Sequence, residues 1–207
     1  RNGTIGEFRR QFDKGGRADS VFFGPEQISI HSVTADQRTG IGVVIEGSAF
    51  DIVAVNLEGP AKFDTLMATR YSEGWPALSP DNRWLAYQSD ESGRMEVYLR
   101  AWPSLGSKVQ VSQNGGTEPT WSRDGKELFY RSGGGTEPKM AAAVVVDGRV
   151  QSRTELFSVG RYEFSTPHRN FDVFPDGRSF AMVRQGTPGQ QAEVVYLQNL
   201  PGLMERR

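Results

Sequence analysis

A short turn motif recurs along this chain, and it constrains the fold more than any other feature. Its aspartates stand about 40–50 residues apart, a spacing that indicates a repeat architecture: Asp36, Asp81, Asp124 and Asp176. Proline before the aspartate presets φ, the carboxylate can accept neighbouring backbone N–H groups, and the following Gly or Asn tolerates positive φ. The turn at 34–37 departs from this pattern, because it lacks both Pro and Gly.

Short apolar runs surround each turn and predict β-strands. The runs last about 4–7 residues between Gly, Pro, Asn and Asp, which is strand and hairpin chemistry and excludes helical solenoids. The runs expected as inner and middle strands lie at 28–33, 41–45, 51–55, 84–89, 96–100, 128–132, 139–144, 180–184 and 193–197. Outer strands are expected at 63–67, 109–112 and 156–159, leaving the fourth repeat without one.

This pattern predicts an all-β β-propeller with about four four-stranded blade repeats, alone or as part of a six-bladed ring. The whole chain, 1–207, is expected to form a single propeller segment, with blades at about 24–70, 71–114, 115–160 and 165–200. Residues 1–23 are expected to be an N-terminal strand or the remnant of a preceding blade, with 6–12 as a candidate closing strand.

Four stretches resemble known propeller families. The sequences at 78–87 and 121–130 resemble the WD40-like (PD40) repeat of TolB-like propellers. The sequences at 96–103 and 111–119 resemble the propeller regions C-terminal to bacterial serine/threonine protein kinases. The resemblance implies a sensory or protein-binding module, with an extracytoplasmic location, periplasmic or at the cell surface, while the cytoplasm stays open. It implies no kinase activity, because the glycine loop and the catalytic and metal-binding motifs of kinases are absent from the sequence.

The amino-acid composition excludes several classes of binding partner and site. Lys and Arg number 24 against 25 Asp and Glu, so no global charge favours nucleic acid or an anionic membrane surface. The absence of cysteine removes disulfides, thiolate nucleophiles and Cys-based zinc sites. No apolar run approaches the roughly 18–20 residues that span a bilayer. Any binding surface must therefore be local. The resemblance implies a protein or peptide partner, and association with an N-terminal part or with other subunits remains open.

The sequence contains no recognisable arrangement of catalytic or metal-binding residues. The recurring aspartates are expected to be structural turn residues, because repetition at blade spacing keeps them apart around a ring. His31 and His168 lack a second ligand at metal-binding spacing, and no Gly-x-Ser-x-Gly elbow occurs. We therefore expect no metal, no cofactor and no enzyme activity. An accessory, gating propeller of a prolyl-oligopeptidase-like hydrolase and a small-ligand sensor are the alternatives to protein binding.

The loops that lead into the inner strands are the candidate binding site, since they surround the mouth of a propeller channel. Aromatic residues mixed with Arg on loops are typical of binding hot spots. The candidates are Arg70, Tyr71, Trp75, Glu118, Arg161, Tyr162, His168 and Arg169. For Trp75 and Tyr162 the competing interpretation is that they cap the core.

Overall fold

The computed structural model describes residues 5–9, 19–24, 27–47, 49–58, 62–133, 137–164, 169–184, 186 and 192–198. Regular structure within these ranges consists of β-strands, so the predicted all-β class is confirmed. The strands are β1 (Ile5–Arg9), β2 (Asp19–Gly24), β3 (Gln27–Val33), β4 (Thr39–Glu46), β5 (Ala49–Asn56), β6 (Phe63–Met67), β7 (Glu73–Leu78), β8 (Trp84–Ser89), β9 (Glu96–Ala101), β10 (Lys108–Gln110), β11 (Gly116–Trp121), β12 (Glu127–Ser132), β13 (Lys139–Val146), β14 (Arg149–Ser158), β15 (Phe171–Val173), β16 (Phe180–Arg184) and β17 (Glu193–Leu197).

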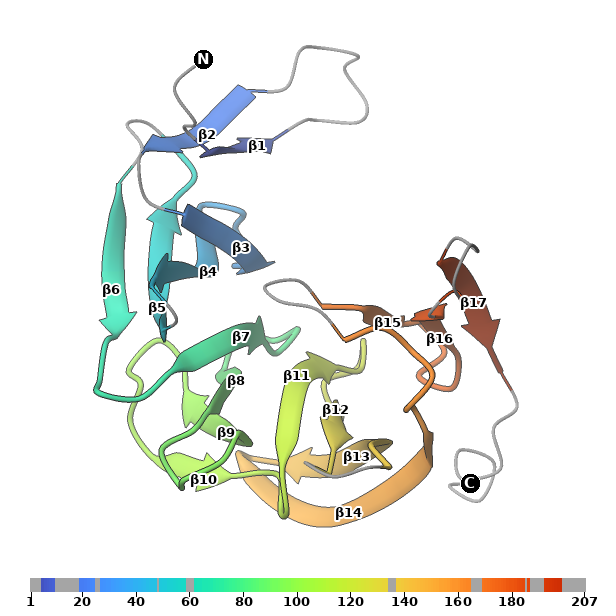
Figure 1. Ribbon diagram of the computed structural model, residues 1–207. Helices are drawn as coiled ribbons and strands as arrows, with labels where there is room; N and C mark the ends of the chain where they lie inside the picture. Colours follow the sequence, from blue (N-terminus) through green and yellow to red (C-terminus); the bar gives the residue numbers. More distant parts are fainter. Residues whose placement is uncertain are drawn as a thin grey trace.

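Four antiparallel sheets follow one another as the blades of a β-propeller, as the sequence predicts. The first blade is β3–β4–β5–β6, the second β7–β8–β9–β10, the third β11–β12–β13–β14, and the fourth β15–β16–β17. In Figure 1 the blades lie around an arc, with β3, β7, β11 and β15 nearest its centre. Within the described residues the fourth blade has three strands, as its missing outer strand in the sequence indicated.

The N-terminal strands lie at one end of this arc. β1 pairs with β2 in a separate two-stranded sheet, and β1 contacts β3 of the first blade. Figure 1 places this hairpin at the opposite end of the arc from β17. The part of 6–12 that is described, in β1, therefore pairs with β2 and not with the last blade.

The outer strand of the third blade is longer than expected. A strand was predicted at 156–159, whereas β14 spans ten residues from Arg149 to Ser158. The reason is the Asp147-Gly148 pair, whose φ values of 46° and 71° form a tight turn directly after β13. Asp-Gly in that conformation matches the twist of two flanking strands, so pairing continues where the sequence analysis expected a break.

Apolar side chains fill the spaces between blades. One cluster joins Ile41 and Ile52 of the first blade to Leu85 of the second, and further clusters join the second to the third blade and the third to the fourth. Because each interior sheet is covered on both faces, its strands carry apolar residues in succession rather than in alternation. The aromatic runs after each turn therefore belong to the core, as predicted.

The recurring aspartates make the same local bonds in the first three turns. Thr34, Ser79 and Ser122 each donate a side-chain hydrogen bond to the aspartate two residues later, at 2.6, 2.5 and 2.8 Å. The backbone N–H groups of residues 38, 83 and 126 donate to the same carboxylates. These bonds close the inner hairpin of each blade, which explains why the aspartates repeat.

The first turn has the same backbone despite its different sequence. Gln37 adopts φ of 59°, where the other turns have Asn82, Gly125 and Gly177 at 55°, 71° and 64°. In the fourth turn Phe174 replaces the hydroxyl residue, and Ser179 donates to Asp176 instead, at 2.7 Å. Residues 34–37 thus form the turn between β3 and β4, although they lack the Pro and Gly of the other turns.

Candidate functional site

Glu118 lies in a buried polar cluster near the centre of the propeller. Its carboxylate forms an ion pair with Arg131 of β12, and the two side chains are 0% and 5% exposed. One carboxylate oxygen also accepts hydrogen bonds from the backbone and side-chain nitrogens of Asn170, at 3.0 and 3.3 Å. The backbone N–H of Glu118 donates to Gln88 of β8 at 3.0 Å. One residue of the third blade is thereby connected to the second and fourth blades.

Arg131 and Arg169 bring positive charge to this cluster. Arg131 donates to the carbonyl of Glu163 at 2.5 Å, and its guanidinium lies 5.9 Å from the ring centre of Phe171. Burial lowers the pKa of Arg169, while the charges of Asp172 and Glu118 oppose that shift. Its buried Nε has no hydrogen-bond partner among the described residues. Buried charges of this kind are stable only when paired and hydrogen-bonded, so Glu118 is the residue on which the cluster depends.

Trp75 occupies the corresponding position in the second blade. Its side chain is 2% exposed and lies against the rings of His31 and Phe50, at centroid distances of 6.1 and 5.4 Å. Both Trp75 and Glu118 precede a proline and have positive φ, 49° and 54°. Each lies where the pairing register of its inner strand shifts, between Gly74 and Ala77 and between Thr117 and Thr120. These bulges turn both side chains into the core, where they pack between blades.

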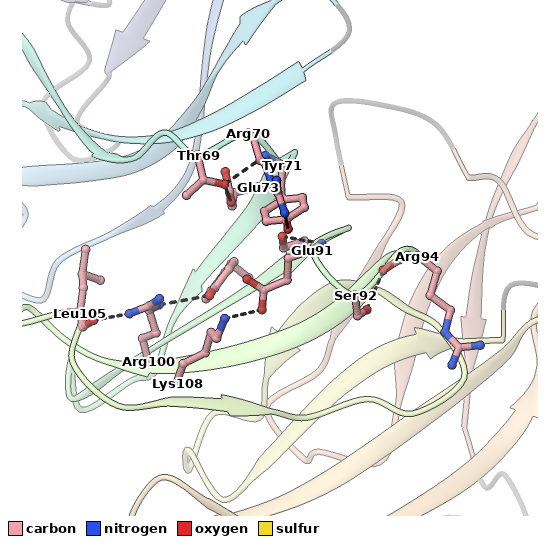
Figure 2. A network of polar contacts seen from close by, with 12 residues as sticks. Thr69, Arg70, Tyr71, Glu73, Glu91, Ser92, Arg94, Arg100, Leu105 and Lys108 are labelled. Atoms are coloured by element: carbon pink, nitrogen blue, oxygen red, sulfur yellow. Dashed lines mark hydrogen bonds and ion pairs between the residues drawn. The ribbon is translucent and has the colours of Figure 1, made fainter.

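Arg70 and Tyr71 lie on the surface, at the edge of a hollow in the second blade. Arg70 donates to the Tyr71 hydroxyl at 2.6 Å and lies over its ring at 4.8 Å. The hollow, about 560 Å³, is lined by Tyr71, Glu91, Ser92, Tyr98, Lys108 and Gln110. Figure 2 shows the side chain of Lys108 pointing toward Glu91. The two form an ion pair at 2.6 Å, so the positive charge of Lys108 is already paired within the hollow.

Glu73 lies behind these surface residues and is almost wholly buried, at 3% exposed. It accepts a hydrogen bond from Thr69 at 2.5 Å, as Figure 2 shows. Burial raises the pKa of Glu73, although the Thr69 bonds oppose the shift. The carboxyl group therefore anchors the 69–73 loop beneath Arg70 and Tyr71.

A hollow also occurs in the equivalent place of the third blade. It measures about 190 Å³ and is lined by residues that include Asn114, Tyr130, Arg153 and Glu155. Asn114 stands ten residues before Asp124, as Tyr71 stands ten before Asp81. The hollow is therefore a product of the repeat. Two tyrosines, Tyr71 and Tyr98, line it in the second blade, and one, Tyr130, lines it in the third.

The remaining candidates lie near the fourth blade. Arg161 is exposed and lies over the ring of Tyr162 at 5.6 Å. Tyr162 itself is 4% exposed and packs in the cluster between the third and fourth blades. His168 lies outside the described residues. The candidates thus fall into separate groups. In the described part of the chain, Arg70 and Arg161 among them are exposed and Tyr71 is half-buried.

Sequence reasoning did not identify one exposed surface, the outer face of the fourth blade. Val194 and Tyr196 of β17 are 79% and 52% exposed, and Phe174 is 39% exposed. The rings of Phe174 and Tyr196 lie 4.8 Å apart in an edge-on arrangement. The signal for this face was present in the sequence, because the run 194–197 is apolar at every position, which indicates a strand covered on both sides.

No group of three or more His, Cys, Asp or Glu side chains in the described ranges is placed to hold a metal ion. No helix among those residues is long and apolar enough to cross a membrane.

Similarity to solved structures identifies the kind of fold. No protein-family model matches the chain, and no curated protein matches it. Several solved structures are similar to the chain. TolB from Acinetobacter baumannii is similar at a TM-score of 0.63 and 18% identity, over 89% of this chain and 44% of TolB. A putative TolB from Agrobacterium tumefaciens gives 0.64 and 15%, over 92% and 74%. A puromycin-hydrolyzing peptidase from Mycobacterium tuberculosis gives 0.56 and 14%, over 88% and 33%.

These similarities establish a TolB-like β-propeller fold and nothing finer. The chain spans less than half the length of the first of these proteins. At identities below one fifth, neither the peptidase nor TolB assigns an activity to this chain.

Proposed function

We propose that this chain is a non-catalytic propeller module that binds a protein partner, as a sensor or scaffold region or as a subunit of a larger assembly. The observation that carries the proposal is the uncovered outer face of the fourth blade. Tyr196 and Val194 are the principal residues of this face, and Phe174 extends it.

This face corresponds to one that is buried in the second blade. In the fourth blade Tyr196 pairs with Ala181, and in the second blade Leu99 pairs with Ala86, so Tyr196 and Leu99 occupy equivalent positions. Two residues earlier on the same strands, Val194 is equivalent to Val97. Val97 and Leu99 are 0% and 1% exposed, because the third blade packs over them. The fourth blade thus presents the surface on which another sheet packs elsewhere in the same molecule.

The chemistry of the face defines the partner. Fully burying a valine or a tyrosine-sized side chain stabilises an interface by roughly 1.5–3 kcal/mol each, and exposed aromatic anchors of this kind are typical of hot spots. β17 is also an edge strand within the described residues, so it can add a strand from a partner. We infer that the partner presents an apolar β-sheet face to β16 and β17.

The kinase association and the location belong to this proposal. The sequences at 96–103 and 111–119 resemble kinase-linked propeller regions, which supports a sensor role in a larger receptor and a location in the periplasm or at the cell surface. Cell fractionation tests the location: recovery with cytoplasmic markers alone would contradict it.

Site-specific photo-cross-linking in the source cells tests the binding surface. A photoreactive phenylalanine analogue at Tyr196 is expected to capture a discrete protein, and Val194→Asp in the same chain is expected to abolish the capture. The same analogue at Val146, which is 51% exposed on another blade, serves as the matched control. Equal capture from both positions would contradict a specific surface.

A further inference from the structure

Glu73, the first residue of β7, is a buried acid without a cationic partner in the part of the chain that the structure describes. The residue is 3% exposed. One carboxyl oxygen, Oε1, accepts the hydrogen bond from Thr69, while Oε2 is buried and has no hydrogen-bond partner. No Lys, Arg or His of the described ranges forms an ion pair with Glu73. An ionised carboxylate in this place loses its hydration and gains only one hydroxyl donor in return.

The neighbouring charges also oppose ionisation of Glu73. Burial is the main reason why its pKa is raised, and the negative charges of Asp51 in β5 and Glu91 after β8 raise that pKa further. On β3, the neighbouring titratable group is His31, whose ring lies 6.1 Å from that of Trp75, two residues further along β7. The neutral form of Glu73 is therefore the form that fits the closed structure.

Two successive hydrogen bonds connect this carboxyl group to the loop before β7. The backbone N–H of Tyr71 donates to Oγ1 of Thr69 at 3.1 Å, and the Thr69 hydroxyl donates to Glu73 at 2.5 Å, the contact drawn in Figure 2. Arg70 stands between the two loop residues and donates to the Tyr71 hydroxyl. The position of the Tyr71 backbone, and with it that of Arg70, therefore depends on Glu73.

The next residue of the loop, Ser72, has anchors of its own. Its backbone N–H donates to Asp90 at 2.9 Å, and its hydroxyl accepts the backbone N–H of Phe50 in β5 at 3.3 Å. Neither bond involves Glu73. A change in the protonation of Glu73 can thus loosen residues 69–71 while β7 stays in place.

We propose that Glu73 is a pH-sensitive switch: its protonated carboxyl group keeps the loop of Arg70 and Tyr71 closed, and loss of the proton as the pH rises loosens that loop. A neutral carboxyl group can remain buried, whereas a carboxylate gains hydration when Thr69 moves away. Because the pKa of Glu73 is raised in the closed loop, the stabilisation is complete below the ordinary value of 4.5 and is lost as the pH rises through the raised pKa. The switch lies in the second blade and does not depend on the proposed partner of the fourth.

Carbon-13 NMR of the carboxyl groups in the full chain tests the protonation of Glu73. Its signal, identified by its absence from Glu73→Gln, is expected to titrate above pH 4.5, the ordinary value. Asp51→Asn is expected to shift this titration to lower pH, because it removes a negative charge. Glu58→Gln, at an exposed position, is the control and should leave the titration unchanged. A Glu73 carboxyl group that titrates at or below pH 4.5 would overturn the proposal.

Amide hydrogen exchange tests the effect on the loop. Relative to an unstructured peptide at the same pH, protection of the Tyr71 N–H should fall about tenfold for each unit by which the pKa of Glu73 is raised. In Glu73→Gln this protection should not depend on pH. The matched control is the Thr39 N–H, which donates to Thr34, whose hydroxyl donates to Asp36; it should stay protected above pH 4.5, because the pKa of Asp36 is lowered. Constant protection of Tyr71 in the wild type, or an equal fall in Glu73→Gln, would show that Glu73 does not control the loop.

Discussion

Glu118 and Arg131 form an ion pair that is almost wholly closed to solvent, with side chains 0% and 5% exposed. The pair lies on neighbouring strands of the third blade, and Asn170 of the fourth blade donates two hydrogen bonds to the same carboxylate. The contact between blades is therefore polar at its centre and apolar around it. A cluster of this kind depends on every partner being present.

Removal of Arg131 is expected to be strongly destabilising. In Arg131→Met the Glu118 carboxylate stays buried without its partner, and the free energy of unfolding should fall by about 3–5 kcal/mol. Arg38→Met, which breaks an exposed pair with Glu58, should cost no more than about 1 kcal/mol. Denaturant titration measures both. The combined Glu118→Gln and Arg131→Met variant should recover part of the loss; no recovery would contradict the charge argument.

The aspartate turns are expected to contribute to stability above pH 4. In Asp124 burial raises the pKa, but the hydrogen bonds from Ser122 and Lys126 outweigh it and lower the pKa overall. An aspartate pKa lower in the folded state than its unfolded value of about 3.9 gives stability that is complete above that value. That stability is lost as the pH falls through the folded pKa.

Asp124→Ala should therefore lower the free energy of unfolding by about 1 kcal/mol at pH 7. The difference between wild type and variant should shrink as the pH falls below about 4. Arg123→Ala, next to it in the turn, is the control and should stay within about 0.5 kcal/mol of the wild type. A deficit of the same size at pH 3 and pH 7 would show that the carboxylate charge is not what closes the turn.

The first turn can be improved. Gln37 has φ of 59°, and a residue with a side chain is strained in that region, whereas glycine is not. Gln37→Gly should raise the free energy of unfolding by a few tenths to about 1 kcal/mol, since the entropy of glycine in the unfolded chain offsets part of the gain. Gln37→Ala keeps the strain and should show no gain. Thermal unfolding of the three proteins distinguishes these outcomes.

The repeat made the fold predictable, but side-chain placement depended on details that periodicity does not encode. The spacing of Asp81 and Asp124 sufficed to predict the propeller, because turn chemistry and strand length agree. Trp75 and Glu118, in contrast, look like loop residues in the sequence; bulges before their prolines bury them. The ion pair between Glu118 and Arg131 could not be predicted either, because Arg131 stands in the apolar run of the next strand, directly after Phe129 and Tyr130.

The outer face of the fourth blade escaped prediction for a different reason. Its apolar run looks the same as those of the interior blades, and only the structure shows that no blade in the described part of the chain lies over Val194 and Tyr196. Among the loop candidates, Arg70 and Arg161 are exposed and Tyr71 is half-buried. Whether they contact a partner stays a prediction.

The affinity of the captured partner, once purified, tests the central claim most directly. Binding should weaken at least about tenfold, or about 1.4 kcal/mol, when Val194→Asp and Tyr196→Ser are introduced together, while the melting temperature stays near that of the wild type. Val146→Asp on the third blade should leave the affinity unchanged. An affinity that the changes at Val194 and Tyr196 do not alter would contradict the account, because the partner would then bind somewhere else.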